Sequence, residues 1–257
     1  MNILFTVCGR AGSKGCKNKN IKEFLGNSLM YYTLSSIDLF IRRNKNNYNN
    51  IDICINSDSD ELLDLAKKSN LNLNIIKRNI ELAGDNTPKT DVIKSSTEIC
   101  ENNNKINYDI VVDLDITSPL RKVSDIEAAI KNKISNRENK VVFSVVEARR
   151  NPYFNMVIND NNNYKLVIES TYVTRQEAPS VYDMNASIYA YERACLVDGE
   201  TEKIFDGPCG IIEMNDTGVL DIDSEKDFEI MQVIAKYFFE KDNELAEVKY
   251  NIENILI

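Results

Sequence analysis

Apolar and polar positions follow a strand–helix rhythm as far as Arg149. Short continuous apolar runs, typical of strands buried on both faces, alternate with segments whose apolar residues have helical spacing. Strands alternating with helices indicate a mostly parallel, doubly wound sheet with right-handed crossovers, and thus an α/β fold. The pattern predicts strands over 2–8, 51–57, 71–78, 108–116 and 140–148, and helices over 28–43, 58–69, 89–101 and 124–135.

After Arg149 the rhythm breaks. Residues 150–184 are aromatic and turn-rich, with a hairpin-like centre whose tip reads "NDNNN", so we expect an arm that leaves the core. Strands are predicted again over 185–192 and 209–214, followed by a long amphipathic helix over 224–241. The tail, 243–257, has only a weak helical pattern. We interpret 1–257 as a single domain with the arm, about 150–184, inserted.

Composition narrows the functional classes. The 257 residues carry a formal net charge of -9, which repels polyanions and argues against a nucleic-acid partner. No apolar run is long enough to span a membrane, and the first apolar run is too short for a signal peptide. Six scattered cysteines are typical of reduced thiols, so we expect a cytoplasmic protein. The chain has no histidine, which leaves carboxylates, lysines, arginines and hard cations for chemistry.

A basic, glycine-studded loop follows the first predicted strand. Gly9, Gly12 and Gly15 permit close backbone approach, while Arg10 and Lys14 offer cationic donors, an arrangement that suits a small anion such as a phosphate group. The spacing fits neither G-x-x-x-x-G-K-[ST] nor G-x-G-x-x-G. A glycine-rich turn with solvated bases is the alternative interpretation. The position of the basic loop directly after a strand of an α/β sheet favours the anion site over this alternative.

Two Asp-x-Asp pairs supply acidic partners. Asp113 and Asp115 end a predicted strand and point the same way, and Asp221 and Asp223 precede the last long helix. Carboxylate pairs beside a polyphosphate site indicate a hard divalent cation, which we expect to be Mg²⁺, with Mn²⁺ as a substitute. The alternatives are a helix N-cap for the later pair and strand-end turn chemistry for the earlier one.

Several blocks together resemble the CMP-sialic acid synthetases, the acylneuraminate cytidylyltransferase family. The blocks occur in the family's order over nearly the whole chain: "GRAGSKGCKNKNI" with "FLGNSLMYYTL", "RNIELAGDNTPKTDVI" (78–93), "DLDITSPLR" (113–121), "NPYFNM" (151–156), "TRQEAPSVYDMNASIYAY" (174–191) and "LDIDSEKDFEI" (220–230). The resemblance implies a Rossmann-like fold with a small dimerisation arm, a homodimer, and the reaction of CTP with a nine-carbon 2-keto sugar acid to give a CMP-sugar and pyrophosphate.

The resemblance also implies roles for individual residues. Catalytic roles fall on Arg10, Lys14, Asp221 and Asp223. Nucleotide contacts fall on Arg10, Ser13, Lys14, Lys19, Asn20, Arg78, Asp85 and Thr87. Sugar contacts fall on Asp115, Thr117, Ser118, Arg175 and Gln176, the last two from the arm reaching the partner subunit. The metal would be held by Asp221 and Asp223, with Asp115 as either a further metal ligand or a sugar contact.

Asp115 marks a departure from the family pattern. It stands where sialic acid enzymes of the family usually have a sugar-reading glutamine, and with "CGRAGSKG" this favours the branch using legionaminic-type 5,7-diacylamino sugars, with N-acetylneuraminate as the alternative substrate. Two other classes remain open from the residues. A metal-dependent glycosyltransferase also places "DLD" after an apolar strand, and a non-catalytic nucleotide-binding module needs no turnover.

Overall fold

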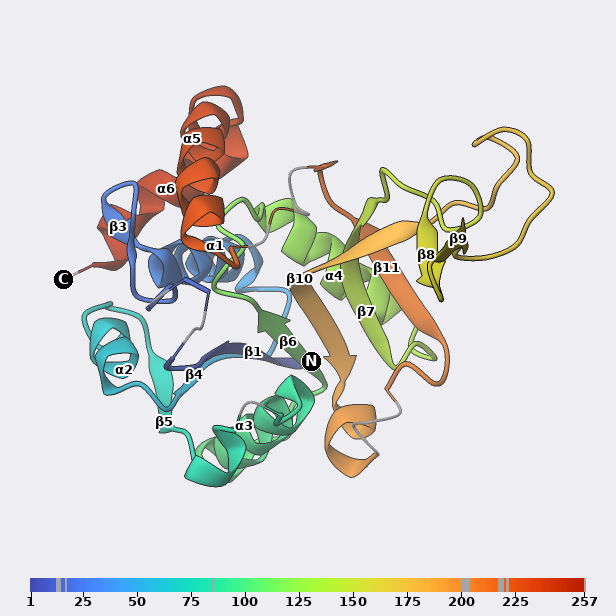
Figure 1. The fold of residues 1–257 in the computed structure, drawn as a ribbon. Helices are drawn as coiled ribbons and strands as arrows, with labels where there is room; N and C mark the ends of the chain where they lie inside the picture. Colours follow the sequence, from blue (N-terminus) through green and yellow to red (C-terminus); the bar gives the residue numbers. More distant parts are fainter. Residues whose placement is uncertain are drawn as a thin grey trace.

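The computed structural model describes residues 1–12, 15–16, 18–84, 86–199, 204–216, 220 and 222–256. Its centre is a seven-stranded sheet in the order β11-β7-β10-β6-β1-β4-β5 (Figure 1). β10 is antiparallel to both of its neighbours, and the other pairs are parallel. The strands are β1 (Asn2–Gly9), β4 (Asn50–Ser57), β5 (Leu73–Lys77), β6 (Ile110–Leu114), β7 (Val141–Glu147), β10 (Tyr182–Glu192) and β11 (Cys209–Glu213).

Helices cover both faces of this sheet. The helices are α1 (Leu29–Asn44), α2 (Asp60–Ala66), α3 (Lys89–Asn104), α4 (Val123–Ser135), α5 (Glu225–Lys241) and α6 (Asn243–Ile255). α3 packs on one face with the π-helical segment η2 (Ala194–Asp198), and the other helices pack on the opposite face (Figure 1). None of the helices in the described ranges is both long and apolar enough to cross a membrane.

The alternation of side chains along the strands produces two cores. On β1, Ile3, Phe5 and Val7 enter the larger core beneath α1, whereas Leu4 enters the smaller core beneath α3. Both faces of a doubly covered strand are buried, which is why the parallel strands read as continuous apolar runs. The predicted mostly parallel sheet flanked by helices is therefore confirmed.

The tail is better ordered than its weak pattern suggested. Asp242 caps α6 by accepting hydrogen bonds from the backbone N–H groups of Glu244 and Leu245. Val248 and Ile252 are completely buried in the larger core, and the Ser35 hydroxyl donates to the Val248 carbonyl at 2.5 Å. Tertiary packing against α1 thus stabilises a helix that intrinsic propensity alone leaves uncertain.

Short elements escaped the sequence prediction. β2 (Glu23–Phe24) and β3 (Asn27–Ser28) form a tight hairpin, and the short 3₁₀ helix η1 (Ile80–Leu82) follows β5. Leu25 and Gly26 form the hairpin turn with positive φ values of 48° and 91°. The hairpin contributes Phe24, which packs edge-on against Tyr32 and Phe228 in the larger core.

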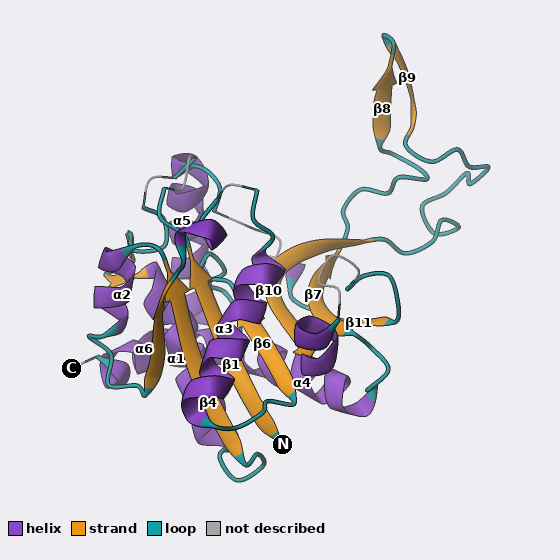
Figure 2. Cartoon of the chain, turned by 90° about the horizontal axis from the view of Figure 1, so that it is seen from below, coloured by secondary structure: helices purple, strands orange, loops and turns teal. Residues whose placement is uncertain are grey.

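The segment between β7 and β10 leaves the body of the protein. It carries the hairpin β8 (Val157–Asp160) and β9 (Asn163–Leu166), which projects away from the sheet (Figure 2). The predicted tip is confirmed, with Asn161 and Asn162 at φ 53° and 66°, as a two-residue hairpin turn requires. The role of this segment as a dimerisation arm stays a prediction.

Candidate active site

The carboxyl ends of the parallel strands border a cavity of about 480 Å³. Arg10, Arg78 and Asp115 each come directly after the last residue of β1, β5 and β6, so the parallel sheet places them along one edge. The cavity is lined by Cys8, Arg10, Gly15, Cys16, Lys19, Asn20, Arg78, Leu82, Gly84, Thr87, Lys89, Val92, Asp115, Thr117 and Asp223.

The amino-terminal loop and the segment before α5 are in direct contact at this cavity. The Lys19 ammonium donates to the Ile222 carbonyl at 2.7 Å and lies 3.4 Å from Asp223 Oδ1. Gly15 approaches so closely that a Cβ there would lie 1.9 Å from the Asp223 carbonyl oxygen. Residues more than 200 positions apart in the chain therefore form one wall, because the glycine has no side chain.

Backbone contacts hold the basic loop in shape. The Ala11 N–H donates to Asp58 Oδ1 at 2.8 Å, and the Asn20 amide donates to the Arg10 carbonyl at 3.2 Å. Gly12 has a φ of 76°, a conformation that favours glycine. Ser13 and Lys14, which carry predicted nucleotide contacts, lie outside the described residues.

The Asp223 side chain takes no part in the N-terminal cap of α5. Ser224 is the N-cap, and it forms a capping box with Asp227. The Asp223 side chain is 79% exposed and lines the cavity. The capping interpretation of "DIDSEKD" thus applies to Ser224 and Asp227, and the Asp223 carboxylate remains available to a ligand. Asp221 lies outside the described residues.

Arg78 lines the cavity and also fixes the start of the basic loop through hydrogen bonds. Its guanidinium is buried and donates to Asn56 Oδ1 at 2.8 Å, to the Gly9 carbonyl at 2.9 Å and to the Asn56 carbonyl at 3.1 Å. These acceptors sit at the ends of β1 and β4, so Arg78 fixes the point where the basic loop begins. Asp85, predicted beside it, lies outside the described residues, and Thr87 lines the cavity.

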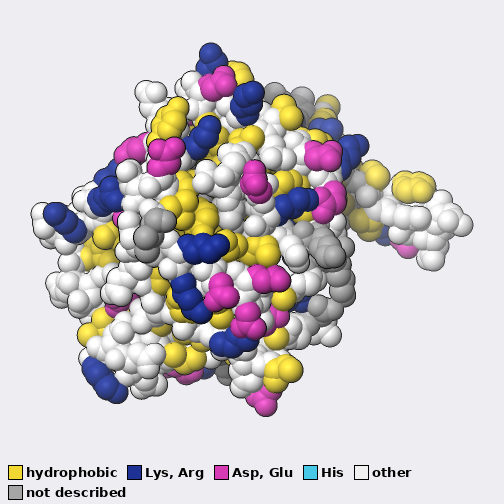
Figure 3. Space-filling view, turned by 90° about the vertical axis from the view of Figure 1, so that its left-hand side faces the viewer, with side chains coloured by type: hydrophobic (Ala, Val, Ile, Leu, Met, Phe, Trp, Pro, Cys, Tyr) yellow, Lys and Arg dark blue, Asp and Glu magenta, His cyan; other side chains and the backbone are white. Residues whose placement is uncertain are grey.

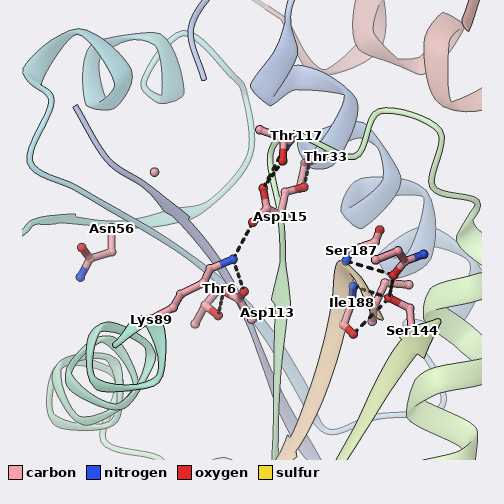
Figure 4. Close-up of polar contacts among 12 residues, drawn as sticks. Thr6, Thr33, Asn56, Lys89, Asp113, Asp115, Thr117, Ser144, Ser187 and Ile188 are labelled. Carbon is pink, nitrogen blue, oxygen red and sulfur yellow. Dashed lines mark hydrogen bonds and ion pairs between the residues drawn. The ribbon is translucent and has the colours of Figure 1, made fainter. Parts of the chain in front are cut away.

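An ion-paired lysine separates the two carboxylates at the end of β6. Lys89 Nζ lies 2.8 Å from Asp113 Oδ2 and 2.8 Å from Asp115 Oδ2 (Figure 4). Asp113 is completely buried, and its Oδ1 accepts a hydrogen bond from the Thr6 hydroxyl at 2.9 Å. Asp115 Oδ1 accepts from both the backbone N–H and the hydroxyl of Thr117. Both aspartate side chains contact Lys89, which confirms the prediction that they point the same way. The Asp115 side chain also forms the predicted turn at the strand end, through its bonds to Thr117.

Charge and burial set the protonation states around this lysine. Burial alone lowers the pKa of Lys89, but the attraction of Asp113 and Asp115 outweighs it and raises the pKa well above its usual value. Burial likewise opposes ionisation of Asp115, yet Lys89 and Thr117 hold its pKa well below the ordinary range. Burial and the Asp113 charge raise the pKa of Cys8 to about 12, so this thiol stays protonated and is a poor nucleophile.

The backbone of Asp115 is fixed by a buried arginine. Arg121 donates to the Asp115 carbonyl at 2.5 Å, to the Ser187 carbonyl at 2.9 Å and to the Ser187 hydroxyl at 3.0 Å. The Asp115 N–H donates to the same Ser187 carbonyl at 3.1 Å. Burial lowers the pKa of Arg121 to about 10, which still leaves it charged at neutral pH.

The structure brings only some of the predicted sugar contacts to the cavity. Asp115 and Thr117 line it, whereas Ser118 does not. Arg175 and Gln176 also lie outside its lining; Arg175 donates to the Ala148 carbonyl at 2.9 Å at the base of the arm, and Gln176 is exposed. Their contact with a partner subunit's site stays a prediction.

Three residues at the site were missed by the sequence analysis: Lys89, Arg121 and Cys8. Lys89 had a detectable signal, because a cation in the first turn of a helix opposes the helix dipole and needs a partner. Arg121 had none, since an arginine near a proline turn usually reads as an exposed residue.

Comparisons with known proteins agree with one another. A family model described as cytidylyltransferase matches residues 4–249. The chain is 37% identical over 232 residues to a CMP-N,N'-diacetyllegionaminic acid synthase of Campylobacter jejuni, covering 90% of this chain and 94% of that protein. It is 34% identical over 234 residues to a post-translational flagellin modification protein B of Campylobacter coli, covering 91% and 95%.

A solved structure shares the fold at low sequence identity. It is that of a CMP:2-keto-3-deoxy-manno-octonic acid synthetase complexed with CTP, with a TM-score of 0.62 and 12% identity. The match covers 92% of this chain and 99% of the other. At this identity the likeness shows the fold alone.

Proposed function

The chain belongs to the cytidylyltransferase family, and from this premise we propose that it joins CMP from CTP to a nine-carbon 2-keto sugar acid and releases pyrophosphate. The preferred substrate is a legionaminic-type 5,7-diacylamino sugar, with N-acetylneuraminate as the alternative. The diacetyllegionaminic acid synthase relative supports this preference, as does Asp115 in place of the family's usual glutamine. Membership of this enzyme family decides against both a glycosyltransferase and a non-catalytic module.

One observation carries the proposal: the basic loop and Asp223 line the same cavity and touch each other. A triphosphate needs cationic donors on one side and a cation-holding carboxylate on the other, and this wall offers both. The acidic protein as a whole repels anions, so a local cluster of Arg10 and Lys19 is required to attract one.

We assign the residues around the cavity as follows. Arg10 and Lys14 stabilise the charge that develops on the departing pyrophosphate, and Ser13, Lys19 and Asn20 hold the phosphates. Arg78, Asp85 and Thr87 form the wall for cytosine and ribose. The reaction then proceeds by in-line attack of the sugar's anomeric hydroxyl on the α-phosphorus, which these contacts favour by positioning the reactants.

Mg²⁺ is the proposed cofactor, held by Asp221 and Asp223, and Mn²⁺ is a substitute. The exposed Asp223 carboxylate at the cavity is the hard oxygen ligand such ions prefer. Among the described residues no group of three or more His, Cys, Asp or Glu side chains is arranged to hold a metal, which suits an ion that takes its other ligands from phosphates and water. When bound, the ion neutralises phosphate charge and polarises the attacking hydroxyl.

The arm is the proposed basis of a homodimer. Many of its large apolar side chains are more than a third exposed, and contiguous apolar surface of this kind often marks an interface; Figure 3 shows hydrophobic side chains on the projection at the right. The exposed residues include Phe154, Met156, Val157, Ile158, Tyr164, Val167, Ile168, Tyr172 and Val173. In the dimer, Arg175 and Gln176 would enter the partner's site, where Arg175 would pair with the sugar carboxylate.

We also propose that the reaction takes place in the cytoplasm. All six cysteines are free thiols, and Cys16, Cys54 and Cys100 are buried. Unpaired cysteines at this density are typical of a reducing compartment.

The decisive experiment incubates purified protein with CTP, Mg²⁺ and a panel of nonulosonic acids, and identifies the products by mass. We expect a CMP-sugar and stoichiometric pyrophosphate, fastest with a 5,7-diacylamino sugar. GTP and UTP serve as controls. CTP hydrolysis without a CMP-sugar, or no turnover with any sugar, would contradict the proposal.

The metal assignment has its own test. Chelation of Mg²⁺, or Asp223→Ala, should lower kcat by a factor of about 10² or more, because the charge on the phosphates is no longer neutralised. Asp64→Ala is the matched control, since Asp64 is an exposed helix carboxylate that pairs with Lys67 and does not line the cavity. Full activity of Asp223→Ala would remove the assignment.

A further inference from the structure

Asp113 and Asp115 form the kind of carboxylate pair that usually holds a divalent cation. They lie two residues apart at the end of a strand and face the same side, and Asp115 lines the cavity assigned to a triphosphate while Asp113 is buried beneath it. The place between them is filled by the Lys89 ammonium, 2.8 Å from one oxygen of each carboxylate (Figure 4). One protein cation therefore already neutralises part of this pair.

Helix geometry does not explain the position of Lys89. It is the first residue of α3, whose N-cap, Pro88, makes no side-chain capping bond. The positive end of the helix dipole disfavours a cation there. The two carboxylates must outweigh this repulsion, so the lysine is held by the pair and not by its own helix.

A count of acceptor positions defines what Asp115 can still do. A carboxylate offers about four lone-pair positions. Asp115 Oδ1 uses two for Thr117, at 2.9 and 2.7 Å, and Oδ2 uses one for Lys89 at 2.8 Å. One position remains on Oδ2 of a residue that lines the cavity. A divalent ion placed there would sit beside the ammonium, whereas a neutral N–H or O–H donor meets no such repulsion.

The backbone contacts keep this remaining position in place. The Asp115 N–H donates to the Ser187 carbonyl, and the Asp115 carbonyl accepts from Arg121 and from the Thr33 hydroxyl at 3.1 Å. Ser187 follows Ala186, which has a φ of 54° at an irregularity in the pairing of β10 with β7. A strand is thus locally distorted beside the residue that holds Asp115, as is common near sites.

We propose that Lys89 is a positioning residue: it excludes a metal ion from the Asp113–Asp115 pair and reserves Asp115 as an acceptor for an N–H or O–H donor of the sugar acid. The proposal deepens the proposed function and rests on it for the identity of the sugar. It assigns Asp115 to the sugar and leaves the metal to the aspartates before α5.

The first test counts bound Mn²⁺ on the free protein by electron paramagnetic resonance, with no nucleotide or sugar present. Lys89→Met should bind one more Mn²⁺ per chain than the wild type, because the carboxylate pair loses its cation. Lys89→Arg, which keeps the charge, should bind the wild-type number. Lys94→Met is the matched control: Lys94 is on the same helix, loses the same charge and does not line the cavity. An unchanged count in folded Lys89→Met would overturn the proposal.

A second variant keeps the test decisive if Lys89→Met fails to fold. With CTP present to supply the phosphate ligands, and the Mn²⁺ bound by CTP alone subtracted, Asp115→Asn in the otherwise unaltered chain should bind as many Mn²⁺ ions as the wild type, because Lys89 still fills the site. Loss of a bound ion in Asp115→Asn would show that Asp115 is a metal ligand, which overturns the proposal. These counts need no turnover, so they stand even if every candidate sugar proves inactive and the proposed function fails.

A kinetic readout separates positioning from a general structural role. In Lys89→Met the KM for the sugar acid should rise about tenfold or more, the effect expected for losing an ordered hydrogen bond to a charged group, while the KM for CTP stays within about twofold. Lys89→Arg should recover part of the loss. Equal rises in both KM values, or a fall in kcat alone, would refute the assignment of Asp115 to the sugar.

Discussion

A methyl group added at Gly15 tests whether the contact between the amino-terminal loop and the segment before α5 matters for catalysis. The Cβ of Gly15→Ala would lie 1.9 Å from the Asp223 carbonyl oxygen, and real Cβ atoms essentially never come closer than 3.0 Å to such an atom. The two segments must therefore separate by about 1 Å or more, since the nearest atom is backbone and cannot rotate away. Gly15 does not have a positive φ, so alanine brings no backbone strain of its own.

The size of the effect follows from this displacement. A shift of about 1 Å between groups that hold two ends of one substrate costs a factor of about 10² in rate, or about 2.7 kcal/mol of transition-state stabilisation. Lys19 would lose its 2.7 Å bond to Ile222 as the segments part. We expect kcat/KM for CTP to fall by about that factor, with the free energy of unfolding lowered by about 1 to 3 kcal/mol, the range for losing one hydrogen bond to a charged group, which leaves the protein folded.

The assay measures pyrophosphate release at varied CTP, with urea unfolding as the check on folding. Gly207→Ala is the matched control, because a Cβ there meets only the flexible end of the Lys140 side chain, 2.9 Å away. Gly207 lies two residues before the edge strand β11 and does not line the cavity. We expect near wild-type activity for Gly207→Ala. Wild-type kcat/KM in a folded Gly15→Ala protein would show that the amino-terminal loop and the segment before α5 can separate without a loss of catalysis. That result would refute the reasoning.

Three further predictions concern stability and assembly. Arg121→Met should lower the free energy of unfolding by about 3 kcal/mol in urea, because a buried hydrogen-bonded guanidinium is lost; exposed Arg137→Met is the control, and a loss below about 1 kcal/mol would contradict it. Burial raises the pKa of Asp125 to about 6, so the native state binds this proton more tightly than the unfolded chain does. The resulting contribution to the free energy of unfolding is complete below the pKa of the unfolded chain. It is lost as the pH rises through about 6, by at most about 3 kcal/mol. Asp125→Asn should remove that pH dependence in urea melts, and an unchanged pH profile would be evidence against it. Replacing Val157 and Val173, which are 61% and 79% exposed, with serine should raise the dimer dissociation constant about tenfold or more in light scattering, because buried apolar area is lost; an unaltered dimer, or a monomeric wild type, would rule out the arm as the interface.

Local pattern was enough to predict the regular elements and their order. The strands read as apolar runs because helices cover both faces of the sheet, and α5 carried its capping signal in Ser224 and Asp227. The motif residues at strand ends could also be predicted to converge, since parallel strands present their carboxyl ends together. Arg10, Arg78 and Asp115 do line one cavity.

What the sequence did not reveal depends on contacts between distant segments. Strand order is one case: nothing in 185–192 indicates that β10 inserts between β6 and β7 and runs antiparallel to both. Lys89 is another, because its partners lie more than 20 residues ahead and are defined only once α3 packs beside β1. Arg121 is the third, because a buried arginine is recognised by its hydrogen-bond acceptors, and the hydroxyl and carbonyl of one of them, Ser187, belong to the distant strand β10.

The central position of β10 has a consequence for how the chain folds. The half of the sheet formed by β1, β4 and β5 is made of units close in sequence, which can assemble early at low entropic cost. The pairing of β10 with β6 joins Leu114 to Ile188 across the whole intervening arm, and in the described sheet this strand pairing alone links β6, β1, β4 and β5 to β10, β7 and β11. We therefore expect the β10–β6 pairing in the middle of the sheet, and not the pairing of an edge strand, to form last. The formation of this long-range pairing would then be the slow step of refolding.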